Sequence, residues 1–384
     1  MEVVERKGIG HPDTICDAAM EQVAIALARA YRNTCGRILH FNADKGLLVA
    51  GAVDCRPGGG TVLEPMRLVI GDRATFEWQG RRLPIEDIAV RAVQEWFTGH
   101  LRHVNPALHL RCQVELRPGS TELRTVIDHH GAPVANDTSA AVGYAPLTPT
   151  ERLVLGLELF LNGAEFKQAF PETGEDVKVL AVRTGADVHV TVAMPLLASA
   201  IRTEADYFAR KAAVLNAIRR FARKDAAPGL SVRIGLNALD RKGVGTEGMY
   251  LSLLGTSAEA GDSGEVGRGN RVCGVISLGR PASAEAAAGK NPVAHVGKIY
   301  TVLAQVLAER LRRDVRGLRE ATVWLTSEIG RPISSPRLAL VEVSLTRGVS
   351  LRSVQPQVRR LAGEALSNIG PFCEALARGE YGVC

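Results

Sequence analysis

The sequence predicts an α+β protein in which antiparallel pairs of strands alternate with long helices. Two observations predict this class. Residues 178–183 and 188–194 are strand-like segments on either side of a short turn, and the second alternates apolar with polar residues. Residues 13–31 carry an apolar side chain at every fourth position, which is typical of a helix with one buried face. Strands that come in pairs argue against a regular βαβα winding.

The remaining predicted elements are given with the helices first and the strands after them. Thr148 and Glu151 form a capping-box pattern with Pro149 between them, which predicts a helix running towards Phe170. Two further long helices are predicted over 207–223 and 292–313. Additional strands are predicted over 231–235, 249–254, 272–278, 321–326 and 338–344.

Composition restricts the class of protein. The 384 residues are 46% hydrophobic and 23% charged, which is ordinary for a chain with a real core and corresponds to about two or three domains. No apolar run approaches the ~18 residues of a membrane span, and no basic run is interleaved with aromatic residues. The net charge of +6 suits small anionic ligands. We therefore expect a cytoplasmic protein with neither a membrane nor a nucleic-acid partner, and seven scattered cysteines without a disulfide framework.

The segment 8–17 is the first that could carry chemistry. Pro12 suits the first turn of a helix, which places His11 and Asp13 at its N-terminus. Asp13 and Asp17 are four residues apart, so both carboxylates share one helix face and could hold a divalent cation. The alternative is that Asp13 only caps the helix, and the segment alone favours that interpretation.

The segment 288–298 is the second segment that could carry chemistry. Asn291 is a suitable N-cap and Pro292 a suitable first helical residue, so a helix is expected to begin here. Gly289 would let an anion approach the free N–H groups, and Lys290 adds a positive charge. A phosphate site and an ordinary helix cap are equally compatible with this pattern. For His295, a packed or surface position is favoured over a ligand role.

Several other segments suit a phosphate-bearing ligand. The glycine-rich segment 261–271 contains Asp262 and Arg268, and Lys178 stands in an alternating strand. Asp137 lies in a turn of small residues, and Gly119-Ser120 forms a turn that could cover a ligand. Together these features indicate a magnesium-nucleotide enzyme without naming its reaction.

Four runs in the same order make the pattern specific. They are residues 5–13 (ERKGIGHPD), 137–151 (DTSAAVGYAPLTPTE), 255–271 (GTSAEAGDSGEVGRGNR) and 286–293 (AAAGKNPV). With these runs the sequence resembles the S-adenosylmethionine synthetase family in its archaeal type, from Val3 to near the C-terminus. The resemblance implies one chain, 1–384, of three similar and intertwined β-α-β-β-α-β units, with discontinuous boundaries near 135 and 255.

The resemblance also implies a reaction. In this family the sulfur of methionine attacks C5′ of ATP and displaces triphosphate, which is then cleaved to phosphate and diphosphate. Members need Mg²⁺ and are usually stimulated by K⁺. Their active sites are shared between two subunits of a homodimer.

Residue roles are implied where a motif matches. His11 resembles the histidine that contacts the leaving triphosphate, and Asp13 the aspartate that binds magnesium. The basic residues that grip the phosphates correspond to Lys178, Arg268 and Lys290. The positions expected to contact nucleotide or methionine are Glu5, Gly119, Ser120, Asp137, Asp262, Gly289 and Asn291.

The sequence departs from the family at a few positions. Ala294 and Cys273 replace polar residues, and Val296 stands where the better-known branch has a metal-binding aspartate. Asp17 or Lys298 are candidate replacements for the missing groups. These departures leave two alternatives open, namely a paralogue that adenosylates another thioether and a catalytically silent nucleotide-binding protein.

Overall fold

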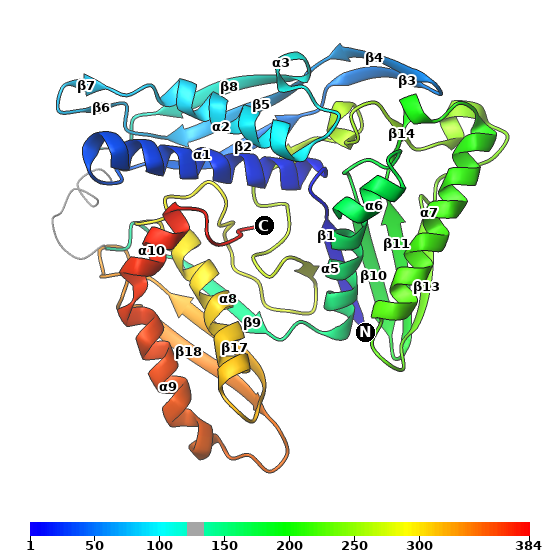
Figure 1. Ribbon diagram of the computed structural model, residues 1–384. Coiled ribbons are helices and arrows are strands. Elements are labelled where there is room, and N and C mark those ends of the chain that lie inside the picture. Colours follow the sequence, from blue (N-terminus) through cyan, green and yellow to red (C-terminus); the bar gives the residue numbers. More distant parts are fainter. Residues whose placement is uncertain (121–133) are drawn as a thin grey trace.

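The computed structural model describes residues 1–120 and 134–384. Three β-sheets each carry helices on one face, and the segment between residues 255 and 295 runs between the three sheet-and-helix units (Figure 1). The α+β class predicted from the sequence is confirmed.

The first unit has a four-stranded sheet in the order β15-β2-β5-β8. Helices α1 and α2 pack on one face of it, and their apolar side chains form a core with Leu48, Leu68 and Ile70. The elements are α1 (Pro12–Cys35), β2 (Asn42–Val49), β5 (Met66–Arg73), α2 (Ile85–His100), β8 (Leu110–Arg117) and β15 (Gly264–Glu265).

The second unit has a five-stranded sheet in the order β13-β11-β10-β1-β16. Val4, Val179 and Ala181 point towards helices α5 and α7 and are buried there. The alternate side chains of β1 and β10, among them Glu5 and Lys178, therefore stand on the face that these helices leave uncovered. The elements are β1 (Glu2–Lys7), α5 (Pro149–Leu161), α6 (Ala164–Ala169), β10 (Lys178–Thr184), β11 (Asp187–Ala193), α7 (Glu204–Asp225), β13 (Ser231–Leu236) and β16 (Ile276–Ser277).

The third unit has a three-stranded sheet in the order β18-β17-β9. Helix α8 packs on β9 and β17, and α9 packs on α8. The elements are β9 (Ala140–Ala145), α8 (Val296–Asp314), β17 (Leu318–Thr326), β18 (Leu338–Leu345), α9 (Leu351–Ser367) and α10 (Ile369–Ala377).

The three units exchange strands in a cycle. Each contains a helix, an antiparallel strand pair and a second helix, but the strand that precedes the first helix joins another unit's sheet. Strand β1 precedes α1 and pairs in the second sheet, β9 precedes α5 and pairs in the third, and β15 lies before α8 and pairs in the first. We propose unit boundaries near residues 135 and 255, with these strands crossing them.

Short elements complete the described chain. They are β3 (Ala52–Arg56), β4 (Gly59–Glu64), β6 (Glu77–Trp78), β7 (Arg81–Arg82), α3 (Pro106–His109), β12 (Leu196–Leu197), η1 (Ala198–Ala200), η2 (Gly245–Gly248), β14 (Leu251–Ser252) and η3 (Ser257–Glu259). None of the helices in the described part of the chain combines the length and apolar character needed to cross a lipid bilayer.

Most predicted helices and strands are present, with shifted ends. The capping box forms, because Thr148 Oγ1 accepts from the Glu151 amide at 3.1 Å and Glu151 accepts from the Thr148 amide at 2.7 Å. That helix ends at Leu161, and a separate helix, α6, follows. The strands predicted over 249–254 and 272–278 shorten to two residues each.

The predicted start of the last long helix is wrong. Helix α8 begins at Val296 with His295 as its N-cap, four residues after the expected start at Pro292. Asn291 instead accepts from the Val293 amide at 3.0 Å and donates to the Leu39 carbonyl at 3.1 Å. Its side chain is therefore engaged in a turn and a long-range contact rather than in a helix cap.

Candidate active site

His11 caps helix α1 through its own ring. Nδ1 accepts a hydrogen bond from the Asp13 amide at 3.2 Å, so the neutral ring carries its proton on Nε2. His11 is 6% exposed, and burial lowers its pKa to about 4 despite the opposing charge of Asp13. At neutral pH the side chain is therefore an uncharged donor held at a helix N-terminus. The sequence placed His11 and Asp13 here correctly.

A close backbone contact holds this turn in place. A Cβ on Gly10 would lie 2.4 Å from the backbone carbon of Glu175, so only glycine fits here without movement. Thr256 adds a hydrogen bond to the Gly10 carbonyl at 2.6 Å. The segment that carries Asp176 and Lys178 is thereby held against the His11 turn.

Charged side chains gather on the same side. Lys7 Nζ lies 2.8 Å from Asp13 Oδ2, and Lys178 Nζ lies 3.3 Å from a Glu5 carboxylate oxygen. Lys7 also donates to the backbone carbonyl of Arg268 at 2.6 Å. Glu5, Lys7 and Arg268 line a groove of about 360 Å³. We call this the His11 group: Glu5, Lys7, His11, Asp13, Lys178 and Arg268.

Asp13 and Asp17 are not a pair of free carboxylates, and the favoured interpretation that Asp13 caps the helix is wrong, because His11 is the N-cap of α1. Asp13 accepts from the Glu265 amide at 3.0 Å, and Asp17 accepts from the Gly267 amide at 2.8 Å. Asp17 is buried, and burial raises its pKa to about 7. Both acids hold the 264–269 segment against α1, and Asp17 is not placed to replace a missing metal ligand.

Lys290 lies in a second groove, of about 790 Å³. Its ammonium contacts the carboxylate of Asp44 and lies 3.1 Å from that of Glu285. Lys290 is only 4% exposed, so these contacts compensate the burial of its charge. We call this the Lys290 group: Asp44, Asp137, Glu285, Lys290 and His295.

The polar backbone groups beside Lys290 form hydrogen bonds within the chain and are not available to a ligand. The Gly289 amide donates to Glu21 at 3.0 Å, and the Gly289 carbonyl accepts from the Ala43 amide at 2.9 Å. Gly289 has φ +75° and lies so close to Ala43 that a Cβ would be 2.2 Å from the Ala43 carbonyl oxygen. The Gly289 N–H is therefore bonded within the chain and not available to an anion.

Lys298 is likewise unavailable to a substrate. It is 1% exposed, and its Nζ lies 2.7 Å from both carboxylate oxygens of Glu21. Val296, at the position of the missing aspartate, is buried in the core of the third unit. Lys298 therefore does not take over the role that was left open for it.

The structure sorts the predicted site residues into two neighbouring groups. Gly267 and Arg271 line both grooves, so one loop forms the wall between them. Asp262 is exposed at the start of that loop, and Asp137 lies in the second groove. Gly119 is buried against His40 and Ser120 is exposed, and neither lines the two grooves.

Sequence reasoning missed several residues in these two groups and beside them. Lys7 and Asp44 are polar residues in strands, and an inward-facing polar residue in an alternating strand is a signal that could have identified Asp44. Asp176 lies two residues before Lys178 and accepts from Ser257, and burial raises its pKa to about 6. Glu285 stands in an alanine-rich run that gives no local signal.

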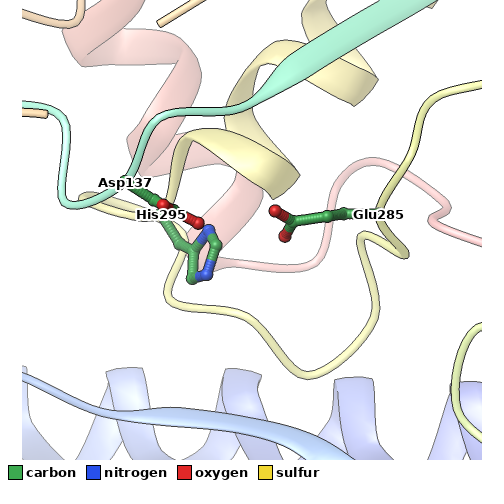
Figure 2. Close-up of side chains that lie close together, drawn as sticks. All are labelled: Asp137, Glu285 and His295. Carbon is green, nitrogen blue, oxygen red and sulfur yellow. The ribbon is translucent and has the colours of Figure 1, made fainter. Parts of the chain in front are cut away.

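Burial and the nearby Glu285 carboxylate also raise the pKa of Asp137. Its Oδ1 accepts from the Thr138 amide at 2.7 Å, and Glu285 accepts from Ser139 Oγ at 3.4 Å. The carboxylates of the two acids point toward each other beside the segment that leads into β9, and candidate ligand atoms of the two lie within 4.8 Å (Figure 2).

A buried lysine supports the segment that leads to Lys178. Lys167 is 8% exposed, and its Nζ donates to the Gly174 carbonyl at 2.6 Å and to Thr173 Oγ1 at 3.3 Å. Burial lowers the pKa of Lys167 to about 7.

Replacing Lys167 by methionine should flatten the pH dependence of stability in alkaline solution. The folded chain releases this proton near pH 7, whereas the unfolded chain keeps it up to about 10.5. In that window the unfolded chain binds more protons, so this group makes stability rise with pH, by at most about 1.4 kcal/mol per pH unit. Urea unfolding at several pH values between about 7 and 10.5 measures how the unfolding free energy depends on pH. Lys224→Met, on the exposed surface of α7, is the control. An equal pH dependence in wild type and Lys167→Met would contradict the prediction.

Fold and site together define an α+β protein of three strand-exchanged units with a neutral histidine and clustered cations at two adjoining grooves. A family model described as S-adenosylmethionine synthetase (AdoMet synthetase) matches residues 1–380. The chain belongs to the S-adenosylmethionine synthetase family.

Relatives named S-adenosylmethionine synthase match over the full chain. Those from Pyrobaculum aerophilum and Aeropyrum pernix are 41% and 42% identical, covering 100% of this chain and 96% and 95% of theirs. A probable S-adenosylmethionine synthase from Aquifex aeolicus is 39% identical, covering 100% of this chain and 95% of its own. The structure of an unusual S-adenosylmethionine synthetase from Campylobacter jejuni has the same fold. Its TM-score is 0.62 at 16% identity, with 99% of this chain and 94% of that chain covered.

Proposed function

We propose that this protein is a methionine adenosyltransferase. It converts ATP, L-methionine and water to S-adenosylmethionine, phosphate and diphosphate. The methionine sulfur forms a bond to C5′ of ATP as the bond from C5′ to the triphosphate oxygen breaks, and water then cleaves the triphosphate. The observation that carries this proposal is the full-length match, at about 40% identity, to relatives named as S-adenosylmethionine synthases.

His11 is proposed to stabilise the leaving group. Its Nδ1 is occupied by the Asp13 amide, which leaves Nε2–H as a fixed, uncharged donor. A fixed donor stabilises the negative charge that develops on the triphosphate oxygen without reorganising in the transition state. Because the sulfur is itself the nucleophile, the protein contributes positioning and electrostatics rather than a covalent intermediate.

The cationic side chains are proposed to bind the phosphates. Lys178 and Arg268 stand at the exposed side of the His11 group, and Lys290 lies in the adjoining groove. Glu5, Asp137 and Asp262 are the acids proposed to lie near the nucleoside and the methionine ammonium. For Gly289 and Asn291 we propose a shaping role, since their polar groups are bonded within the chain.

Asp13 is proposed as a magnesium-binding residue. Both its oxygens already accept a hydrogen bond, from Glu265 and Lys7, so it offers one carboxylate rather than a complete ligand cage. That fits Mg²⁺, which is commonly held by one or two carboxylates together with substrate phosphates and water. When bound, Mg²⁺ supplies positive charge that offsets the charge of the triphosphate. K⁺ is proposed as an activator.

A homodimer with shared active sites is proposed for the assembly. Lys178 and Glu5 stand on a sheet face that its own helices leave uncovered, while Lys290 is enclosed by other elements. A second copy facing this sheet could bring its Lys290 group to the His11 group. We also propose that the protein acts in the cytoplasm.

The direct test is product identification. The protein with ATP, L-methionine, Mg²⁺ and K⁺ should yield S-adenosylmethionine, phosphate and diphosphate, detected by mass spectrometry and phosphate analysis. Omitting K⁺ should lower the rate. Absence of product at any reasonable substrate concentration would falsify the proposed activity.

Mixing two inactive variants tests the shared site. In a mixed dimer of one His11→Asn and one Lys290→Met subunit, one of the two sites combines the intact His11 of the Lys290→Met subunit with the intact Lys290 of the His11→Asn subunit. The other site carries both substitutions. An equimolar, fully exchanged mixture should recover about a quarter of wild-type activity. If each chain builds its own site, the mixture will stay inactive.

A further inference from the structure

An arginine of the first unit holds the segment of the second unit that leads into β10. Arg102 lies just after α2. Its guanidinium donates through Nε to the Glu175 carboxylate and through Nη2 to the Thr173 carbonyl, the latter at 2.6 Å. A planar guanidinium that donates to two acceptors holds both in a fixed relative geometry, which a single ammonium group cannot do.

The Glu175 carboxylate depends on this contact. Glu175 is only 3% exposed, and Arg102 is its one ion-pair partner within 4.0 Å among residues 1–120 and 134–384. In the same ranges its Oε2 has no hydrogen-bond partner. A buried carboxylate is costly unless it is paired, so the position of Glu175 depends on the Arg102 side chain. That side chain is itself 35% exposed, which makes it accessible to substitution without opening the core.

The backbone of Glu175 holds the turn that carries His11. The Glu175 carbonyl accepts from the Gly10 amide at 3.1 Å, and the Val177 carbonyl accepts from the Gly8 amide at 2.6 Å. His11 follows directly and is the N-cap of α1. A displacement of Glu175 would therefore reach His11 through one backbone hydrogen bond.

These contacts form a closed ring around the start of α1. Helix α2 packs on α1, and Arg102 follows α2. Arg102 contacts Glu175, and the Glu175 carbonyl binds the Gly10 amide just before α1 begins. The ring thus joins the helix that carries His11 to the segment that enters the second sheet. Contacts of this kind, outside the reacting groups, are what hold a functional side chain in one orientation.

We propose that Arg102 is a positioning residue for the transfer reaction and acts on His11 through Glu175. This inference rests on the proposed function. Arg102 lines neither of the two grooves, so it has no direct contact with a substrate bound there. The His11 donor stabilises developing charge only when its Nε2–H points at the leaving oxygen, and a misplacement of about 1 Å can cost about 10²-fold in rate. Arg102 should therefore affect kcat rather than substrate binding.

Hydrogen exchange of the substrate-free protein, followed by mass spectrometry, tests the link between Arg102 and the His11 turn. In Arg102→Gln the peptide that contains the Gly10 and His11 amides should exchange at least about tenfold faster, because the carbonyl that accepts from Gly10 is no longer held. Peptides from α9 should keep their wild-type rates, since the loosening is local. Arg91→Gln, which changes an exposed side chain of α2, should leave both regions unchanged. Wild-type exchange at Gly10 in Arg102→Gln would refute the proposal.

A double-mutant cycle in kcat tests the role of Arg102 in the reaction. Arg102→Gln should lower kcat by about 10–100-fold and change KM by less than about threefold. In a His11→Asn background the same substitution should lower kcat by less than about threefold, because the donor that Arg102 positions is already absent. Equal losses in the two backgrounds would show that Arg102 supports the fold without positioning His11.

Arg102→Lys provides the same test if the Arg102→Gln chain does not fold. Lysine keeps a positive charge beside Glu175 but lacks the guanidinium fork, so exchange at Gly10 and kcat should change in the same direction by smaller factors. If Arg102→Lys matches wild type in both measurements, the fork is not required and the proposal is wrong. Because exchange needs no turnover, the two failures are distinguishable. A wild-type protein that forms no S-adenosylmethionine refutes the proposed function, whereas unchanged exchange refutes only the role of Arg102.

Discussion

Replacing His11 by asparagine should lower kcat by about 10²–10³-fold, the loss typical of removing one donor that stabilises developing charge. Asparagine is a good N-cap, so its side chain can still accept from the Asp13 amide. It is too short to present a donor where Nε2–H now stands. Because the lost interaction forms mainly in the transition state, KM should change far less than kcat. Steady-state kinetics with ATP and methionine measure both constants.

His11→Ala separates the two functions of this ring. Alanine removes the cap as well as the donor, so kcat should fall as much as in His11→Asn. The unfolding free energy should fall as well, by about 0.5–2 kcal/mol. A His11→Asn enzyme with near wild-type kcat would show that the Nε2 proton has no part in catalysis. If kcat fell in His11→Ala alone, His11 would act through the helix cap.

The predictable parts of the fold are those encoded by neighbouring residues. The capping box at Thr148 and the β10–β11 hairpin need only local hydrogen bonds and alternation, and both formed where expected. The sheet of the first unit was not predicted, because β5 pairs in parallel with β8 across helix α2. Such a pairing depends on the whole fold and leaves no local signature in the sequence.

The same distinction between local signals and long-range packing applies to the site residues. His11 and Asp13 were placed at a helix N-terminus because Pro12 marks that position locally. The start of α8 was misplaced because the Asn291 amide binds the carbonyl of Leu39, a residue 252 positions away. Glu285 could not be recognised in its alanine-rich run, since only the fold brings it to Asp137 and His295. The motifs thus identify which residues matter, while their partners come from long-range packing.

The buried pair of Glu21 and Lys298 fixes the position of Lys290 within the Lys290 group. Glu21 lies on α1 in the first unit and Lys298 on α8 in the third, and Glu21 also accepts from the Gly289 amide beside Lys290. One carboxylate therefore joins two helices and fixes the turn that carries Lys290. Both side chains are nearly inaccessible to solvent, so each charge depends on the other for compensation.

Replacing Lys298 by methionine should lower the unfolding free energy by about 3–5 kcal/mol, because Glu21 would keep a buried and uncompensated charge. Adding Glu21→Gln removes that charge and retains an acceptor for the Gly289 amide, so the double variant should be more stable than Lys298→Met alone. A double-mutant cycle from urea unfolding measures the coupling. Arg360→Met, which breaks the exposed pair with Glu364 on α9, should change stability far less. If Lys298→Met proved as mild as Arg360→Met, solvent would have to reach Glu21, and the pair could not be what holds Lys290 in its groove.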